Sequence, residues 1–427
     1  MPKIPPEEQT LIAVNGDEAV AYAVKQSLVD VVAAYPITPQ TIIVEKISEF
    51  VANGEIHTEF IPVESEHSAM SVCVGAAAAG ARAFTATSSQ GLALMVEIVY
   101  IAASLRLPIV MAVVNRALSA PINIHCDHSD AMLMRDSGWI QLFVENSQEA
   151  YDTTIQAFRI AEDPKVQLPV AVNLDGFFLS HTLEDLRILP DKAVHEFLGG
   201  YRKPVKTFVD YLGKEVPVVL DPENPLTFGP LDLYDYYYEH KMHQVEAMAN
   251  VKDVVRKVNE EYAELSGRSY GDGVLVPYAV EDADVIVVVM GSTAGTVRYV
   301  VKRLRERGYK VGTVRVRLFR PFPEAELREL LKDAKTVIVM DRAISFGSYG
   351  PLYLEVNNAL YPLRTRPYTI NVIYGLGGRD ARPEMIKKLI EDVYEETRRG
   401  AEGPRLRFMG VRVKGAQEDI VSIPNYP

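Results

Sequence analysis

Short apolar runs alternate with longer segments of helical spacing along the first half of the chain. The apolar runs 83–87, 108–114 and 169–173 are separated by helical segments such as 92–103 and 147–161. Strands that are apolar along their whole length are buried on both faces, and their alternation with helices is typical of a parallel sheet covered by helices. The pattern therefore predicts an α/β domain over residues 1–278.

The alternation breaks off and later resumes, which indicates a second domain. Periodicity is lost in a surface excursion at about residues 190–230, and a long helix is expected over 234–266. From residue 284 strands and helices alternate again, and we assign residues 279–400 to a smaller α/β domain. Residues 401–427 contain few core-forming side chains and are expected to form an arm along a partner or another part of the chain.

The stretch 62–91 joins an expected strand end, two acids and an alanine-rich helix. Glu64 and Glu66 stand beside Val63, where the helix 67–79 begins. The helix macrodipole favours carboxylates at this place, so a capping role accounts for one of the two acids. A carboxyl among apolar neighbours would have a raised pKa and could exchange protons with a ligand. The small side chains of the helix allow close approach, which places it at an interface or under a site.

Polar residues follow several of the expected strands at the point where each strand ends. Because ligands bind at the carboxyl ends of the strands in open parallel sheets, these residues are expected to share one site. They are Glu64 and Glu66; Ser88, Ser89, Gln90 and Gly91; Asn115 and Arg116; Asp175 and Gly176; and Thr38 from a proline-rich connector.

Composition restricts the class of partner. A formal net charge of −12 argues against nucleic-acid binding, which needs a basic surface. No apolar run is long enough to span a bilayer, and the first residues show neither the basic nor the apolar region of a signal peptide, so a cytoplasmic protein without a membrane partner is expected. Two cysteines, Cys73 and Cys126, without a C-x-x-C motif cannot hold an iron–sulfur cluster. Any electron transfer would need a partner.

Three further segments resemble ligand sites. Gly271-Asp272-Gly273 looks like the start of a thiamine-diphosphate motif, but the next asparagine is the distant Asn357, so a turn is expected. The adjacent residues 125–128 cannot all face one ion, so no metal site is expected in this chain. The glycine-rich segment 375–378 lacks the G-x-G-x-x-G spacing and is also expected to be a turn.

Six short motifs occur in an order that resembles one family. They are YPITP (35–39), SEHSA (65–69), TSSQG (87–91), NRA (115–117), DHSD (127–130) and DGF (175–177). Together they resemble the alpha subunit of the 2-oxoacid:ferredoxin oxidoreductases, the group that contains pyruvate synthase. In the second half, MGS (290–292) and RLFRPFP (317–323) are similar to that subunit's transketolase-C-terminal-like domain. The resemblance covers nearly the whole chain.

The resemblance implies a fold, an activity and a complex. Both domains would be transketolase-like, and residues 1–278 would bind the pyrimidine of thiamine diphosphate. The enzyme, typical of anaerobic metabolism, would oxidatively decarboxylate a 2-oxoacid, most simply pyruvate, to acyl-coenzyme A and CO₂, with electrons passing to ferredoxin. A beta subunit would carry the diphosphate site with its Mg²⁺. Gamma and ferredoxin-like delta subunits, or fused equivalents, would complete the complex and supply the iron–sulfur clusters.

The resemblance also implies which residues contact the cofactor. Glu66, rather than Glu64, would be the catalytic carboxyl that hydrogen-bonds the pyrimidine ring atom N1′. Ser89, Gln90 and Gly91 would lie at the cofactor.

The substrate residues follow from the same motifs. Arg116 would grip the substrate carboxylate, a task that suits a guanidinium fork, and Thr38 would donate a hydrogen bond beside it. The alternatives are a surface or ion-paired arginine and a helix-capping threonine.

Other interpretations share part of this pattern. The substrate could be a branched 2-oxoacid, 2-oxoglutarate or oxalate. The pyrimidine subunits of lipoamide-linked 2-oxoacid dehydrogenases share the layout but lack the YPITP and DHSD stretches. A non-catalytic scaffold paralogue would need none of Thr38, Glu66 and Arg116.

Overall fold

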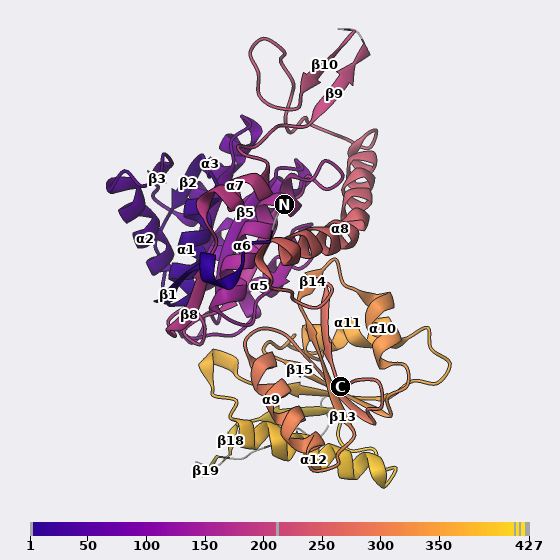
Figure 1. The fold of residues 1–427 in the computed structure, drawn as a ribbon. Coiled ribbons are helices and arrows are strands. Elements are labelled where there is room, and N and C mark those ends of the chain that lie inside the picture. The colour runs from indigo at the N-terminus through magenta and orange to yellow at the C-terminus, as the bar shows by residue number, and fades with distance from the viewer. Residues whose placement is uncertain (1–2, 211–212, 414–415, 418–419, 423–427) are drawn as a thin grey trace.

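The computed structural model describes residues 3–210, 213–413, 416–417 and 420–422, and it contains two seven-stranded sheets (Figure 1). The first sheet is parallel except for one edge strand, β14, which runs antiparallel to its neighbour. Its strands are, in spatial order, β14 (Leu318–Arg320), β6 (Ile140–Phe143), β7 (Val170–Asp175), β5 (Ile109–Asn115), β4 (Ala83–Thr87), β2 (Val31–Ala34) and β3 (Glu59–Pro62).

Helices cover both faces of this sheet, as the apolar runs predict. In the central strand β5, Val110 and Ala112 pack into one core while Ile109 and Met111 pack into another, because successive side chains point to opposite faces. The first core includes helices α1 (Gly16–Gln26), α2 (Thr41–Ala52) and α6 (Ser147–Glu162), and the second includes α3 (Glu66–Ala78) and α4 (Ser89–Ser104). The α/β prediction is confirmed.

The second sheet has five parallel strands between two antiparallel edge strands. Helices pack on both of its faces, and among the described helices none is both long and apolar enough to cross a bilayer. The strands are, in spatial order, β11 (Leu275–Tyr278), β13 (Val311–Val316), β12 (Val285–Val289), β15 (Thr336–Asp341), β16 (Tyr368–Ile373), β17 (Leu406–Met409) and β20 (Ile420–Val421). The helices are α9 (Thr293–Arg305), α10 (Glu324–Leu331), α11 (Pro351–Leu360) and α12 (Pro383–Arg398).

The boundary between the halves differs from the expected division at residue 278. β11 precedes that boundary but forms an edge of the second sheet, where it pairs antiparallel with β13. β14 follows the boundary but pairs with β6 of the first sheet. Each domain therefore completes its sheet with a strand that sequence position would assign to the other.

Several elements were not predicted. One of them is β2, which follows helix α1; the helix ends at Gln26, and Leu28 then takes a left-handed φ of 52°. The excursion 190–230 contains helix α7 (Asp191–Leu198) and a hairpin of β9 (Lys206–Val209) and β10 (Lys214–Pro217), which projects from the top of Figure 1. The expected arm after residue 400 lies along the chain itself, because β17 pairs with β16; residues 423–427 lie outside the described part.

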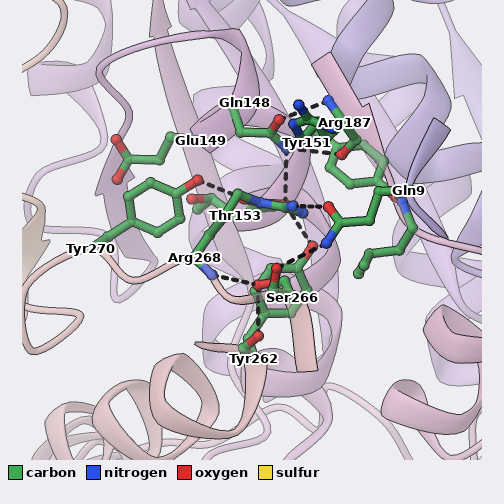
Figure 2. A network of polar contacts seen from close by, with 12 residues as sticks. Gln9, Gln148, Glu149, Tyr151, Thr153, Arg187, Tyr262, Ser266, Arg268 and Tyr270 are labelled. Carbon is green, nitrogen blue, oxygen red and sulfur yellow. Dashed lines mark hydrogen bonds and ion pairs between the residues drawn. The ribbon is translucent and has the colours of Figure 1, made fainter. Parts of the chain in front are cut away.

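A buried polar network joins α6 to α8, to the connection that follows it and to the second half of the chain. The Asp152 carboxylate accepts hydrogen bonds from Tyr262 at the end of α8 (Tyr237–Ser266), at 2.6 Å, and from Arg268 and Tyr270 in the following connection (Figure 2). One turn earlier, Glu149 accepts from Arg315 and Arg317 of the second half. Burial alone would raise the pKa of Glu149, but the two guanidinium groups outweigh it and hold the pKa below its usual value.

Candidate active site

Glu66 is the first residue of α3, and its side chain is 6% exposed. The N-cap of this helix is Ser65, whose hydroxyl accepts from the Ser68 backbone N–H at 3.2 Å, and Glu66 lies in the first turn, where the macrodipole favours a carboxylate. Glu64 is exposed and accepts from the Ser68 hydroxyl at 2.6 Å, and this hydrogen bond lowers its pKa. The expectation of a raised pKa is therefore wrong for Glu64. The two acids differ in burial: Glu64 is exposed, and Glu66 is buried in the protein.

The Glu66 carboxyl lies against the start of α4. A β-carbon built on Gly91 would be 2.6 Å from Glu66 Oε1 and 2.6 Å from Thr87 Oγ1, so the space between these groups exists only because residue 91 is a glycine. The Thr87 and Ser88 hydroxyl oxygens are buried and have no hydrogen-bond partner in the described part of the chain. Unpaired buried hydroxyls are costly, and a polar ligand beside Glu66 would relieve that cost. Sequence reasoning did not single out Thr87, although it opens the TSSQG motif.

Ser89 and Gln90 direct their side chains toward a neighbouring loop. The Ser89 hydroxyl donates to the Ala117 carbonyl oxygen at 2.6 Å, and the Gln90 side chain contacts the hydroxyls of Ser89 and Ser119. Ser89 also has a left-handed φ of 46°, which is strained for a residue with a side chain. These two residues shape the turn between β4 and α4, and Gly91 is the member of the trio that meets Glu66.

Arg116 and Thr38 come together as expected, but through a backbone atom. Arg116 follows β5 and is 6% exposed; its Nη1 donates to the Thr38 carbonyl oxygen at 2.9 Å and its Nε to the Asn123 carbonyl oxygen at 3.0 Å. Within the described residues its Nη2 makes no hydrogen bond. The Thr38 side chain is exposed in the turn before α2. Burial lowers the pKa of Arg116. Arg116 is therefore buried, and among the described residues it forms no ion pair.

Asp130 connects the two groups of site residues. Its carboxylate is fully buried and accepts four hydrogen bonds, from the backbone N–H groups of Ser89, Arg116 and Ala131 and from the Asn115 side-chain amide. Burial raises its pKa to about 6. Asp130 ends the DHSD motif, which was the available signal, but its partners are distant in sequence and no local pattern indicates them.

Asp175 joins the carboxyl ends of the two sheets. Its carboxylate accepts from the Ser292 backbone N–H after β12, at 3.1 Å, and from Arg342 Nη1 after β15, at 2.8 Å, and it lies 2.7 Å from His128 Nε2. Burial would raise the pKa of Asp175, but Arg342 and His128 outweigh it and hold the pKa well below its usual range. Asp175 therefore belongs to the contact between the domains, although its place at a strand end predicted a role with the other polar residues.

Cys126, His128 and Asp175 each have an atom that could bind a metal ion, and these atoms lie within 4.8 Å of one another. Two of the residues 125–128 therefore do lie in one cluster with Asp175. Both Asp175 oxygens already contact His128, Ser292 or Arg342. The cluster is thus a hydrogen-bonded junction of the two domains.

The segment 271–273 is a turn, as expected. Asp272 Oδ1 accepts from the backbone N–H groups of Val274 and Leu275 at 2.9 and 2.8 Å, and Asp272 Oδ2 pairs with Arg256 at 3.0 Å. Both oxygens of this carboxylate are engaged within the chain. The segment 375–378 is likewise a tight turn, in which Gly378 N–H donates to the Cys126 carbonyl oxygen at 2.7 Å.

Two α/β domains that meet at the carboxyl ends of their sheets, with a buried carboxyl at one of those ends, define the transketolase-like class of thiamine-diphosphate-binding proteins. Residues 22–260 match the family model described as pyruvate flavodoxin/ferredoxin oxidoreductase, thiamine-diphosphate-binding, and residues 283–386 match pyruvate:ferredoxin oxidoreductase core domain II. The chain belongs to the 2-oxoacid:ferredoxin oxidoreductase family and corresponds to its alpha subunit.

Proteins of similar sequence carry names that agree with this family assignment. Pyruvate synthase subunit PorA of Thermotoga maritima is 59% identical over 381 residues, which cover 89% of this chain and 94% of the relative. PorA of Methanocaldococcus jannaschii is 51% identical over the same shares. Ketoisovalerate oxidoreductase subunit VorA of Pyrococcus abyssi is 47% identical over 89% of this chain and 92% of the relative.

A solved structure supports the fold. It is described as 2-oxoglutarate:ferredoxin oxidoreductase from Magnetococcus marinus with 2-oxoglutarate, coenzyme A and succinyl-CoA bound, and it superposes with a TM-score of 0.71 at 21% identity. The match covers 90% of this chain and 65% of that chain. At this identity the likeness shows the transketolase-like fold alone.

Proposed function

We propose that this chain supplies the pyrimidine half of a thiamine-diphosphate site in a multisubunit pyruvate synthase. The observation that carries the proposal is the buried Glu66 carboxyl, which faces Gly91 and the unpartnered Thr87 hydroxyl. When bound, thiamine diphosphate supplies the nucleophilic carbon for the 2-oxo group and holds the electron pair that decarboxylation releases. Glu66 would exchange a proton with the ring atom N1′, and the Thr87 hydroxyl is available to the same ligand.

Arg116 would bind the substrate carboxylate. A guanidinium group carries five N–H donors, and the hydrogen bonds to Thr38 and Asn123 use one on Nη1 and the one on Nε. Three donors remain, one on Nη1 and two on Nη2, and these would serve to bind a carboxylate. Thr38, whose carbonyl oxygen holds this group and whose side chain is exposed, would donate a further hydrogen bond through its hydroxyl.

Other chains would complete the site. The turn at 271–273 has its Asp272 carboxylate engaged, so the diphosphate and its Mg²⁺ are assigned to a beta subunit. Cys73 and Cys126 are free and buried, so iron–sulfur clusters are assigned to a ferredoxin-like delta subunit, beside a gamma subunit or fused equivalents. Coenzyme A would accept the acyl group and ferredoxin the electrons. We place the complex in the cytoplasm, in keeping with free thiols.

An exposed aromatic segment supports a partner on the α4 side of the first domain. Leu231 is 88% exposed and Tyr234 99% exposed, and Tyr236, Tyr237 and Tyr238 follow them as exposed side chains. Monomeric soluble proteins rarely leave such an apolar patch uncovered. The segment leads into α8, which contacts the C-terminal end of α4, where Lys241 donates to the Ser104 hydroxyl at 2.7 Å. A beta subunit seated over this end of α4 would cover it.

Two measurements test the proposal. The reconstituted complex, assayed with a dye acceptor, should oxidise pyruvate with a higher kcat/KM than 2-oxoisovalerate, 2-oxoglutarate or oxalate. A preference for 2-oxoisovalerate would make the chain a VorA-type subunit instead. By calorimetry the lone chain should bind thiamine diphosphate weakly, and tight Mg²⁺-dependent binding would assign the diphosphate site to this chain.

A further inference from the structure

The helix α4 has an N-terminal cap that comes from a distant part of the chain. Its N-cap residue, Ser88, makes no side-chain capping hydrogen bond. Instead Asp130 Oδ2, 41 residues further along the chain, accepts from the Ser89 backbone N–H at 3.0 Å. A helix N-terminus leaves its first N–H groups unpaired and favours negative charge, so a buried carboxylate satisfies both requirements. Asp130 therefore holds the strained Ser89 and, with it, the start of α4.

The same oxygen also holds the end of β5. Asp130 Oδ2 accepts from the Arg116 backbone N–H at 2.9 Å, while Oδ1 accepts from the Asn115 side-chain amide at 3.0 Å. Two hydrogen bonds to one atom keep the Ser89 and Arg116 backbone nitrogens less than about 6 Å apart. One carboxylate thus fixes the spacing between the turn that presents Gly91 to Glu66 and the residue that carries the guanidinium group.

We propose that Asp130 is a positioning residue of the active site, which sets the placement of Arg116 relative to the α4 turn that packs against Glu66. The proposal rests on the proposed function, in which Glu66 faces the cofactor and Arg116 the substrate. It differs from a purely structural cap because a displaced Asp130 would disturb two ligand sites at once. A misplacement of about 1 Å at such a site costs on the order of 100-fold in rate.

The chemistry of the four partners makes Asp130→Asn a sharp test. Every partner of the carboxylate is an N–H donor, so the amide of asparagine must turn its own NH₂ group toward donors in either orientation. In the assembled complex, well below the melting temperature, we expect kcat/KM for pyruvate to fall roughly 10- to 100-fold. We also expect the Kd for thiamine diphosphate, measured by calorimetry on cofactor-stripped complex, to rise at least several-fold.

An exchange of groups provides the rescue. In the double variant Asp130→Asn with Asn115→Asp, the new carboxylate at 115 accepts from the new amide at 130, whose oxygen can again accept from Ser89 and Arg116. Net charge is unchanged. We expect the double variant to recover most of the lost cofactor affinity, short of the wild type because the Ala131 N–H still faces an amide NH₂.

The matched control is Asp127→Asn in the same loop. The Asp127 carboxylate accepts from Ser129 and Gly377 and touches neither Ser89 nor Arg116. Both ligand parameters should stay at wild-type values in this variant. If Asp130→Asn lowers the melting temperature but leaves Kd and KM unchanged, or changes nothing, Asp130 is only a structural cap and the proposal is overturned. A wild-type complex without 2-oxoacid activity would overturn the proposed function separately, while the calorimetric comparison would still decide the role of Asp130.

Discussion

Gly91 stands so close to Glu66 that a β-carbon on residue 91 would lie 2.6 Å from the Glu66 Oε1 atom. Glu66 is the first residue of α3 and Gly91 lies in the first turn of the neighbouring α4, so both helix starts converge on this carboxyl. The position of the Glu66 carboxyl thus depends on residue 91 having no side chain as much as on the groups around the carboxyl.

Gly91→Ala should displace the Glu66 carboxyl and lower kcat of the assembled complex on the order of 100-fold. Stability should change little, because the helix-propensity gain of about 1 kcal/mol is offset by overpacking of about 1–3 kcal/mol. The measurement is kcat with pyruvate beside the melting temperature. Wild-type kcat in a folded Gly91→Ala variant would show that the Glu66 position is unimportant.

Gly75→Ala is the control for this substitution. Gly75 lies inside α3 and is exposed, and a β-carbon there would meet nothing within 4 Å. The isolated chain should gain up to about 1 kcal/mol in free energy of unfolding from helix propensity alone.

Glu66→Gln should reduce kcat by about 100-fold or more, because the amide keeps the shape but cannot exchange the proton. Glu64→Gln should be mild, since Glu64 is exposed and its carboxylate accepts a hydrogen bond from Ser68 on the same surface. Both variants should keep the wild-type melting temperature within a few degrees. If Glu64→Gln abolished activity while Glu66→Gln stayed near normal, the proton exchange would belong to Glu64 and the assignment to Glu66 would be wrong.

Local patterns located many elements because the signals lie within the elements themselves. The strand 83–87 was predicted to the residue as an apolar run, and the helix expected over 147–161 is observed over Ser147–Glu162. β14 could not be predicted in the first sheet, because it has three residues and its partner β6 lies about 175 positions earlier. Such pairings are decided by tertiary packing, which sequence spacing does not contain.

The site was predictable to the extent that its residues end strands. The motifs indicated Glu66, Gly91 and Arg116, and the structure buries all three. They did not indicate that Asp175 is hydrogen-bonded to Ser292 and Arg342 of the second domain. Nor did they indicate that Asp130 accepts hydrogen bonds from both Ser89 and Arg116. Both relationships link segments far apart in the chain, and an acid followed by a turn carries no mark of its partner.

Arg116→Ala should lower kcat/KM for the 2-oxoacid, and Arg116→Lys should lower it by a similar factor. An ammonium group cannot hold the Thr38 and Asn123 carbonyl oxygens and still offer two parallel donors to a carboxylate. Loss of a charge-assisted hydrogen bond costs about 1.5–3 kcal/mol, or roughly 10- to 150-fold in kcat/KM for the 2-oxoacid, while thiamine-diphosphate affinity should be spared.

The control is Arg135→Lys, a half-exposed arginine paired with Asp136, which should leave both parameters unchanged. Unchanged kinetics of Arg116→Lys at unchanged melting temperature would remove Arg116 from the substrate site.

The raised pKa of Asp130 predicts a pH-dependent stability. Burial, aided by the charge of Asp127 and opposed by the N–H donors of Ser89 and Arg116, lifts the pKa from 3.8 to about 6. Between these values the folded chain binds more protons than the unfolded chain, so stability from this group falls as the pH rises. Asn at 130 does not titrate. The free energy of unfolding of the wild type minus that of Asp130→Asn should therefore decrease by roughly 3 kcal/mol from about pH 4 to about pH 7.

Urea unfolding of the isolated chain at a series of pH values measures this difference directly. Because a carboxyl with a lowered pKa would give the opposite slope, a difference that grows with pH would show that the N–H donors of Ser89 and Arg116 outweigh burial. In that case Asp130 would be an anion throughout this range, and its hold on α4 and β5 would weaken only below the ordinary range of carboxyl titration.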